Sequence, residues 1–398
     1  MKSLEDPDAW GTSRRSRLFP GPFLVHADLH NHTQLSDGAG DPAMLFPSLR
    51  EAGLDVAAIT DHSRWATAFL GVVQAPGWTG IDGRSWRLAA ELADKFNDDG
   101  EFVAMRGFEW SHATHGHMNV WGSRGFTDPL RSAPTMGRWW RWLESKGRDG
   151  LVSFNHPGTG RMRFANFGYR PKMAGRLVGL EVFNRADDYL FKGIDRGRPS
   201  PIAQCLDAGW RPGLLGVTDE HGDDWGRPEG KGRTGLYVRD LSRSGVTEAL
   251  AARRFFASRV RGLRLDAALT NSDGARARMG TAVPDSGGGV LVELDLDLGQ
   301  AWWGRSLNVQ ILRPDARPDA RPGALPAIVE ARTVRLPAPD EPVISFEVEL
   351  GTAAGDWAIV RVTDPAQPAD PRAPAAYAGL GAAIAYASPF WLEPPEQG

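Results

Sequence analysis

A row of one aspartate and two histidines near the start of the chain constrains the fold more than any other feature of the sequence. Asp28, His30 and His32 follow the apolar run Phe23–Val25, which is typical of a buried strand. Alternate side chains of a strand share a face, so these three would lie side by side. Two imidazoles next to a carboxylate indicate a metal site rather than a packing pattern. The stretch therefore predicts metal binding at the end of a strand, with Asp37 as a further carboxylate in the following turn.

Composition limits the class of protein. The 398 residues are enough for one large domain and a smaller one. A net charge of −3 gives no indication of a nucleic-acid partner or an anionic membrane partner. Cys205 is the single cysteine, which excludes an intrachain disulfide and a cysteine-based zinc site. Because we find neither a signal peptide nor a run of about 18 apolar residues, we expect a soluble cytoplasmic protein that acts on a small molecule.

Apolar runs alternate with helical segments from residue 23 to about residue 240. The seven apolar runs are Phe23–Ala27, Leu54–Ile59, Phe102–Met105, Leu151–Phe154, Leu177–Phe183, Leu214–Val217 and Gly235–Val238. Helices are expected at Pro42–Ala52, Ser85–Phe96, Met136–Lys146 and Ile202–Ala208, the first with Asp41 as its N-cap. This alternation is typical of a parallel sheet covered by helices. Seven strands in one run predict an α/β barrel or a large open sheet.

Six of these runs are followed by a histidine or a carboxylate. In chain order the residues are Asp28, His30 and His32; Asp61 and His62; Glu109; His156; Glu181; and Asp219 with His221. The carboxyl ends of parallel strands converge on one rim of an α/β sheet, so we expect these side chains to meet. Each one alone would more often be a hydrogen-bonded structural residue. Six strand ends with the same chemistry favour one shared site, and none of the nine histidines follows residue 221.

The pattern changes after roughly residue 258. Val290–Leu298 and Ile344–Leu350 alternate apolar and polar residues, and Trp357–Thr363 is a third strand candidate. Such alternation predicts a half-buried antiparallel sheet, most simply a small β-sandwich. Two proline-rich segments, Arg313–Pro322 and Pro365–Pro374, are interpreted as extended loops between strands. We interpret this part of the chain as an accessory domain.

Taken together, the strand-end motifs resemble the PHP (polymerase and histidinol phosphatase) superfamily of metal-dependent phosphoesterases. They occur in the family's order as Asp28–His32 with Ser36–Gly38, Thr60–His62, Glu109, Asn155–Pro157 and Asp219–His221. Gly116–Gly122 and Ala385–Phe390 look like the branch that includes carbaryl-hydrolase-type metallohydrolases. The resemblance implies an N-terminal tail over residues 1–22, a distorted (β/α)7 barrel over 23–257 and a β-rich accessory domain over 258–398.

The resemblance also implies a centre of two or three divalent metal ions at the barrel rim. By motif, His30, His32, Glu109 and Asp219 would hold one metal, Glu109 and His156 a second, and Asp37, His62 and His221 a third. Three-metal members of the family usually supply another histidine after the fifth strand. Here no histidine lies between residues 156 and 221, which leaves Glu181, Asn184 or His117 as substitutes, or a centre of two metals.

The expected chemistry is hydrolysis by a metal-bound hydroxide. A ligand set of imidazoles and carboxylates suits Zn, Mn or Fe better than Mg or Ca. Asp28 and Asp61 are candidates for orienting the ligand histidines through hydrogen bonds. His117 is a candidate for protonating the leaving group, although a structural loop histidine is an equal alternative.

Arginines and tryptophans suggest how a substrate would bind. Arg64, Arg161, Arg163, Arg185 and Arg227 follow strand ends and could hold a phosphate, the alternative being a solvated charged rim. The cluster Trp139, Trp140 and Trp142 is either the packed side of a helix or an aromatic wall around a substrate.

Three functions fit the sequence. A phosphoesterase acting on a small phosphorylated molecule leads, because that is what the superfamily resemblance mostly implies. A carbamate, amide or ester hydrolase with the same metal centre is the alternative that the looser branch resemblance favours. A non-catalytic scaffold stabilised by metals is third, and the nearly complete set of ligand motifs counts against it.

Overall fold

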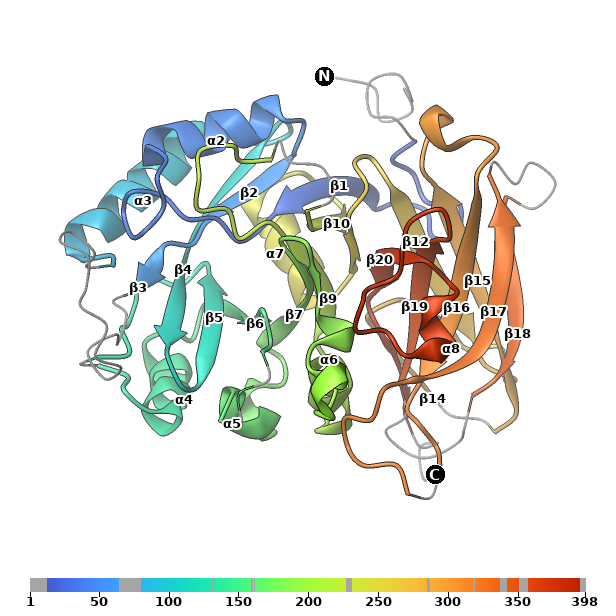
Figure 1. The fold of residues 1–398 in the computed structure, drawn as a ribbon. Helices are drawn as coiled ribbons and strands as arrows, with labels where there is room; N and C mark the ends of the chain where they lie inside the picture. Colours follow the sequence, from blue (N-terminus) through green and yellow to red (C-terminus); the bar gives the residue numbers. More distant parts are fainter. Residues whose placement is uncertain are drawn as a thin grey trace.

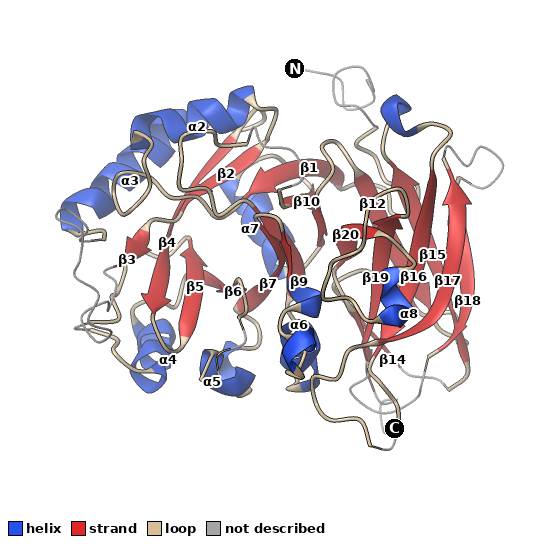
Figure 2. Ribbon diagram, viewed as in Figure 1, coloured by secondary structure: helices blue, strands red, loops and turns tan. Residues whose placement is uncertain are grey.

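The computed structural model describes residues 13–63, 80–130, 132–158, 160, 162–226, 231–284, 287–317, 319–336, 342–350 and 357–393. The first part of the chain forms a mixed α/β assembly with helices on its outer side, and the second part is built almost entirely from strands (Figures 1 and 2). Among the described residues, no helix is both long enough and apolar enough to cross a membrane.

All seven strands expected in the first part are present. They are β1 (Phe23–Asp28), β2 (Val56–Ile59), β4 (Val103–His112), β6 (Leu151–Asn155), β7 (Leu177–Asn184), β9 (Gly213–Val217) and β10 (Arg233–Val238). The pairs β1–β2, β2–β4, β6–β7 and β7–β9 are parallel, as expected for buried apolar strands. The carboxyl ends of β1, β2, β4, β6, β7 and β9 therefore open toward a common edge.

The expectation of a wholly parallel, barrel-like sheet was only partly correct. β10 pairs antiparallel with β1, and an additional strand, β5 (Gly116–Trp121), lies antiparallel between β4 and β6. No ladder among the described strands joins β9 to β10, although Thr234 Oγ1 donates to the carbonyl oxygen of Gly216 at 2.7 Å. The architecture is thus mixed α/β with a large sheet that backbone pairing does not close.

Helices cover this sheet at the positions that the sequence indicated. They are α2 (Pro42–Glu51), α3 (Gly83–Phe96), α4 (Met136–Ser145) and α6 (Pro201–Asp207), followed by α7 (Arg243–Ala251). Asp41 is the N-cap of α2, since its carboxylate accepts a hydrogen bond from the amide of Ala43 at 2.9 Å. Shorter elements are β3 (His62–Ser63), α5 (Phe164–Phe167), η2 (Pro171–Met173), β8 (Asp187–Asp188), η3 (Tyr189–Phe191) and η4 (Ile194–Arg196).

The tryptophans of α4 belong to the hydrophobic core. Trp139, Trp140 and Trp142 are all buried, and the Trp139 ring stacks on Trp110 at a centroid distance of 4.6 Å. Trp139 also donates its indole N–H to the sulfur of Met118 at 3.0 Å. The packing interpretation of this cluster is therefore confirmed, and the aromatic-wall interpretation is wrong for these three residues.

The second part consists of two antiparallel layers. One has the order β13 (Arg276–Arg278), β12 (Arg264–Thr270), β15 (Gly289–Asp297) and β18 (Ile344–Glu349). The other contains β17 (Ala327–Arg335), β16 (Ser306–Arg313), β19 (Trp357–Asp364) and β20 (Ala382–Ala387), with β14 (Ala282–Pro284) and β21 (Phe390–Glu393) at its end. Leu294 from the first layer and Ile311 from the second lie in one apolar cluster. The three strands that the sequence indicated are β15, β18 and β19, and the proline-rich segments follow β16 and β19.

The two parts are joined through β11 (Phe255–Ser258), within which the predicted boundary at residues 257 and 258 falls. β11 pairs with β10 on one side and with β20 on the other. A buried contact adds to this ladder: Tyr386 of β20 receives a hydrogen bond from Arg361 at 2.9 Å and donates one to Asp188 at 2.8 Å. Asp188 in turn caps η3, so the β-rich part supports a loop that follows β7.

Candidate metal centre

The structure brings the predicted ligands together in one cluster from five strands or the residues that follow them. His30 and His32 follow β1, His62 lies in β3, Glu109 in β4, His156 follows β6, and Asp219 and His221 follow β9. Asp37 comes from the loop between β1 and α2, and His117 comes from β5. His30, His32 and Glu109 are fully buried. The convergence that the strand-end pattern predicted is therefore present.

Glu109 lies at the middle of the cluster, between four imidazoles. Its Oε1 atom is 3.2 Å from Nε2 of His30 and 3.2 Å from Nε2 of His156. Its Oε2 atom is 2.6 Å from Nδ1 of His62 and 3.4 Å from Nδ1 of His117. Oε2 is also 3.8 Å from Nε2 of His32. Each carboxylate oxygen thus faces its own set of histidines, an arrangement that suits a carboxylate shared between two metal ions.

Asp37 forms a second focus with three histidines. Its Oδ2 atom is 3.2 Å from Nε2 of His221 and 3.5 Å from Nε2 of His62, and its Oδ1 atom is 3.8 Å from Nδ1 of His32. The ligand atoms of these four residues all lie within 4.8 Å of one another. This group contains the three residues that the family resemblance assigns to a third metal, with His32 in addition.

Asp219 forms a third focus. Its Oδ1 atom is 3.1 Å from Nε2 of His32 and 3.4 Å from Nε2 of His30, and the two imidazole nitrogens are 3.0 Å apart. If a single proton lay between these two nitrogens, Oδ1 of Asp219 and one of the nitrogens would still point lone pairs at each other within this buried group. A single cation would satisfy both nitrogens and the carboxylate oxygen at once, and the donors are of the types that bind divalent transition metals. The residues present therefore fit divalent metal binding.

Two further ligand groups complete the cluster within the described residues. One consists of His30, Glu109 and His156, and the other of His62, Glu109 and His117. The second group contains His117, one of the three substitutes considered for the missing histidine, which reaches the cluster from the unpredicted strand β5. The assignment of each residue to a particular metal stays a prediction.

Burial and mutual charge shift the pKa values in this cluster in opposite directions. Burial raises the pKa of Glu109, but the surrounding imidazoles outweigh it and hold that pKa well below its usual range. Burial lowers the pKa of His62, but Glu109 and Asp37 outweigh it and raise that pKa to about 10. Burial lowers the pKa of His32 to about 3 and that of His117 to about 4. Near neutral pH, Glu109 is thus an anion, and His32 and His117 are neutral imidazoles.

Asp28 and Asp61 were expected to orient ligand imidazoles; in the structure their carboxylates accept hydrogen bonds from hydroxyl and backbone donors. Asp28 accepts hydrogen bonds from the hydroxyl and, at 3.2 Å, the amide of Thr218. Asp61 accepts hydrogen bonds from the amide and hydroxyl of Thr33, both at 2.8 Å, and from Ser36 Oγ at 2.6 Å. Both carboxylates are saturated by backbone and hydroxyl donors, so they fix the ligand-bearing loops. Burial raises the pKa of each to about 6 against these bonds.

Glu181 contacts the ring of a candidate ligand. Its Oε1 atom is 2.7 Å from Nδ1 of His30, and its Oε2 atom accepts hydrogen bonds from the amide of His156 at 2.6 Å and from Asn184 at 2.9 Å. Glu181 and Asn184 lie outside the four ligand groups found among the described residues. The available signal in the sequence was a single charge within the apolar strand Leu177–Asn184, since such a charge needs a buried partner.

The backbone is strained where three strands end. His156 after β6, Arg185 after β7 and Asp219 after β9 have φ angles of 28°, 52° and 49°. Residues other than glycine rarely adopt such angles, and they persist only where the surrounding structure enforces them. Arg185 lies beside the cluster, with its guanidinium 2.8 Å from Nδ1 of His221 and 3.5 Å from Oδ2 of Asp219. The strain thus coincides with the edge that carries the candidate ligands.

Of the other arginines predicted to bind substrate, the structure describes only Arg163. Arg163 is half-buried on a loop after β6, and its guanidinium packs against Gly158, two residues beyond His156. Arg64 and Arg161, and also Arg227, lie outside the described residues.

No family model matches the chain, and no curated protein matches it. Among solved structures, the chain is similar to a two-domain protein from Bacteroides vulgatus that contains a predicted PHP-like metal-dependent phosphoesterase, with 18% identity, a TM-score of 0.45 and coverage of 92% of this chain and 96% of that one. It is also similar to a candidate metal-dependent phosphoesterase from Bifidobacterium adolescentis, with 17% identity, a TM-score of 0.32 and coverage of 56% and 95%. For an Endonuclease Q complex with a lesion-containing duplex, the identity is 14%, the TM-score 0.34 and the coverage 57% and 56%. PHP-like proteins, which the strand-end motifs resemble, are thus among the structures similar to this chain.

Proposed function

We propose that this chain is a metal-dependent hydrolase of the PHP type, and that it is a phosphoesterase acting on a small phosphorylated molecule. The observation that carries the proposal is the position of Glu109, whose two oxygens face separate pairs of histidines. Asp37 and Asp219 form further foci on the same cluster. A site that binds two or three ions side by side suits in-line displacement at phosphorus.

Zn, Mn or Fe are the metals that this donor set favours. Asp37, His32, His62 and His221 would hold one ion, His30 and His156 a second, and Asp219 with the nearby imidazoles would complete the coordination. When bound, such ions lower the pKa of a water molecule and polarise the bond under attack.

The protein's own residues bind and orient around that chemistry. Arg185 lies beside Asp219 and His221, where its guanidinium can donate forked hydrogen bonds to phosphoryl oxygens. Glu181 fixes the ring of His30 by accepting from Nδ1, which leaves Nε2 directed at the cluster. The contact of His117 with Glu109 and its low pKa support a ligand role for His117 over proton donation to a leaving group.

The alternative function is a carbamate, amide or ester hydrolase. One of the two arguments for it does not hold. Its aromatic argument rested on the tryptophan cluster, and Trp139, Trp140 and Trp142 are buried in the core. It is retained as an outcome of the test below.

The test is a hydrolysis panel with the metal-loaded protein. Phosphomonoesters, aryl carbamates and aryl esters are offered with added Mn or Zn, and the metal content of the purified protein is measured by elemental analysis. The His30→Ala variant is compared with His115→Ala, which removes a histidine outside the ligand groups. We expect phosphoester turnover that His30→Ala abolishes and His115→Ala keeps. Turnover of carbamates or esters alone would favour the alternative, and full activity of His30→Ala would exclude both.

A further inference from the structure

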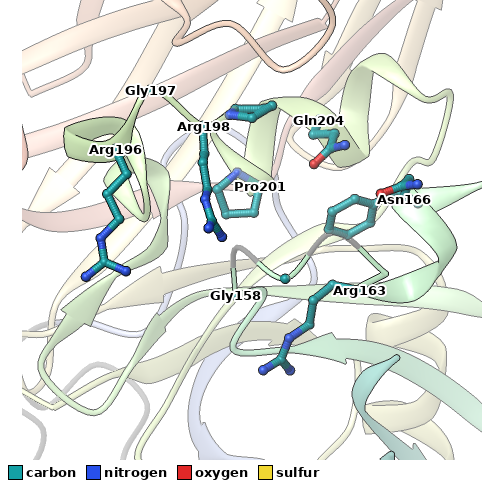
Figure 3. Close-up of a pocket in the computed structure, with 11 residues that line it drawn as sticks. Gly158, Arg163, Asn166, Arg196, Gly197, Arg198, Pro201 and Gln204 are labelled. Atoms are coloured by element: carbon teal, nitrogen blue, oxygen red, sulfur yellow. The ribbon is translucent and has the colours of Figure 1, made fainter. Parts of the chain in front are cut away.

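The connection from β7 to α6 begins beside the metal centre. Its first residue, Arg185, donates from Nε to the carbonyl oxygen of Asp219 at 3.2 Å, and its guanidinium is 2.8 Å from Nδ1 of His221. Further along, the connection lines a basic cavity of about 660 Å³, whose described lining contains three arginines and no aspartate or glutamate (Figure 3). Arg185 thus joins this connection to the candidate ligands, and residues 185–188 are called the β7 loop below.

Arg185 has a backbone conformation that residues other than glycine rarely adopt. Its φ angle is 52°, a strain that costs on the order of 1–3 kcal/mol and persists only where the surroundings enforce it. Its side chain is 54% exposed, so the guanidinium loses rotamer freedom whenever it is held in one place. The β7 loop therefore needs contacts from outside the loop to hold Arg185 against the candidate ligands.

Arg259, the residue after β11, contacts the chain on both sides of Arg185. Its guanidinium donates to the carbonyl oxygen of Ala186 at 2.7 Å and lies over the ring of Phe183, 4.3 Å from the ring centroid. The backbone amide of Arg259 donates to the carbonyl oxygen of Ile384 in β20 at 2.8 Å. Arg259 thus ties the residues before and after Arg185 to the β-rich part.

The second proline-rich segment, Pro365–Pro374, supplies another arginine. Asp370 and Pro371 begin a turn in which the amide of Ala373 donates to the carbonyl oxygen of Asp370 at 2.9 Å. The Asp370 carboxylate accepts two hydrogen bonds from the guanidinium of Arg372, at 2.8 and 2.6 Å. A forked pair of this kind fixes the plane of the guanidinium.

The same guanidinium also reaches the β7 loop. Nη2 of Arg372 is 3.1 Å from Oδ1 of Asp187 and donates to the carbonyl oxygen of Asp188 at 3.3 Å. Tyr386 donates to the carboxylate of Asp188 at 2.8 Å. Side chains of the β-rich part therefore hold three consecutive residues of the loop, 186 to 188.

We propose that Arg259 and Arg372 are positioning residues for Arg185, so that the β-rich part controls how tightly the metal centre binds an oxyanion. This inference rests on the proposed function, in which Arg185 donates to phosphoryl oxygens. Both residues act through the backbone that carries Arg185. Without either contact, Arg185 occupies its binding position for a smaller fraction of the time, and the apparent affinity falls by that fraction.

Binding of phenylphosphonate tests the proposal without turnover. The probe is titrated calorimetrically into the metal-loaded wild type, Arg259→Met, Arg372→Met and the control Arg335→Met, whose arginine is exposed on β17. We expect Arg259→Met to weaken binding by about tenfold and Arg372→Met by about threefold, because Arg259 contacts the neighbours of Arg185 directly. The control should match wild type.

A double variant shows whether the effect passes through Arg185. Once Arg185→Met is in place, adding Arg259→Met should weaken probe binding no further, because the two changes remove the same interaction. Hydrogen–deuterium exchange should rise in peptides that cover the β7 loop in both single variants. With a phosphomonoester as substrate, both should raise KM and leave kcat within about twofold.

The outcomes for the two proposals are distinguishable. Wild-type affinity in both single variants, a full additional loss in the double variant, or no binding of the probe by wild type would each overturn the positioning proposal. If the binding results hold but no phosphoester is hydrolysed, the proposed function fails and the positioning stands. Circular dichroism and elemental analysis check that each variant is folded and metal-loaded, and the two single variants serve as independent tests.

Discussion

Two kinds of buried carboxylate, one in each part of this molecule, differ in the partners that surround them. In the β-rich part, Asp295 accepts two hydrogen bonds from the guanidinium of Arg264, at 3.0 and 3.1 Å. Asp266 accepts two from Arg278, at 2.9 and 2.6 Å. In the α/β part, Glu109 is surrounded by imidazoles. The first kind of pairing is complete within the protein, and the second has unused nitrogen and oxygen lone pairs.

This difference distinguishes charged groups that stabilise the fold from charged groups that can bind a metal ion. A guanidinium is always protonated, so an arginine–aspartate pair is permanent and contributes only to the fold. An imidazole changes charge near neutral pH and binds metals when neutral, so a cluster of imidazoles and carboxylates can take up an ion. Each of the following substitutions should therefore affect either stability or metal chemistry, and only weakly the other.

The largest effect is expected on stability when a complete pair is broken. Asp295→Ala leaves the buried guanidinium of Arg264 with Asp297, at 3.4 Å, and the carbonyl oxygen of Ser13, at 2.6 Å, as partners. We expect the free energy of unfolding in urea to fall by about 3–5 kcal/mol, with unchanged metal content. The control is Asp98→Ala, which breaks the exposed pair with Arg50 and should cost less than about 1 kcal/mol. A similar fall in the free energy of unfolding for the two variants would contradict the view that the buried pair stabilises the fold more than an exposed pair does.

The next largest effect is on metal chemistry. Glu109→Gln keeps the shape of the side chain but removes the charge that all four imidazoles face. Hydrolysis should fall by more than about a hundredfold, the upper end of the loss seen for residues that only support a ligand. Elemental analysis should show fewer bound ions. Full metal occupancy in Glu109→Gln would contradict the central position of this carboxylate.

A smaller loss is expected at Glu181. Glu181→Gln weakens the contact that fixes the ring of His30, so metal affinity or activity should fall by about 10–100-fold. The matched comparison is Asp28→Asn, because Asp28 contacts Thr218 and the backbone rather than an imidazole ring. Competition with a chromophoric chelator gives the metal affinity of each variant. A larger loss of affinity for Asp28→Asn would restore Asp28 as the orienting residue.

The smallest effect tests the contact between the two parts. Tyr386→Phe removes the hydroxyl that joins Arg361 to Asp188, which should cost about 1–2 kcal/mol of stability. Tyr377→Phe is the control, since its hydroxyl bonds the carbonyl oxygen of Pro326 and not the loop after β7. Both variants should be destabilised, but KM should change only for Tyr386→Phe. Equal KM values would mean that the β-rich part does not influence the site.

The sequence predicted which residues form the candidate site more accurately than it predicted which side chains those residues contact. His30, Glu109 and Asp219 were recognisable because each follows a continuous apolar run, and parallel strand ends must converge. The exchange of roles between Asp28 and Glu181 was not recognisable, since both are single carboxylates near a strand and only their distances to His30 distinguish them.

Short sequence patterns could not predict the order of the strands or the basic cavity either. β5 is a hairpin partner of β4, and the antiparallel pairing of β10 with β1 joins segments that are distant in the sequence. Arg196 is the last residue of η4 and Arg198 lies two residues beyond it, so neither follows a strand and the strand-end pattern does not indicate them. The left-handed turn at Phe164–Phe167 contains no glycine to mark it.

The position of β11 has a consequence for how the protein unfolds. Phe256 and Ala257 are hydrogen-bonded through their strand to β10 on one side and to β20 on the other. Heat should therefore melt both parts in a single cooperative transition, which calorimetry would show as one peak. A chain cut after residue 258 would expose one edge of β11, and an unpaired apolar edge is a template for self-association. We therefore expect the cut chain to self-associate, which light scattering would measure.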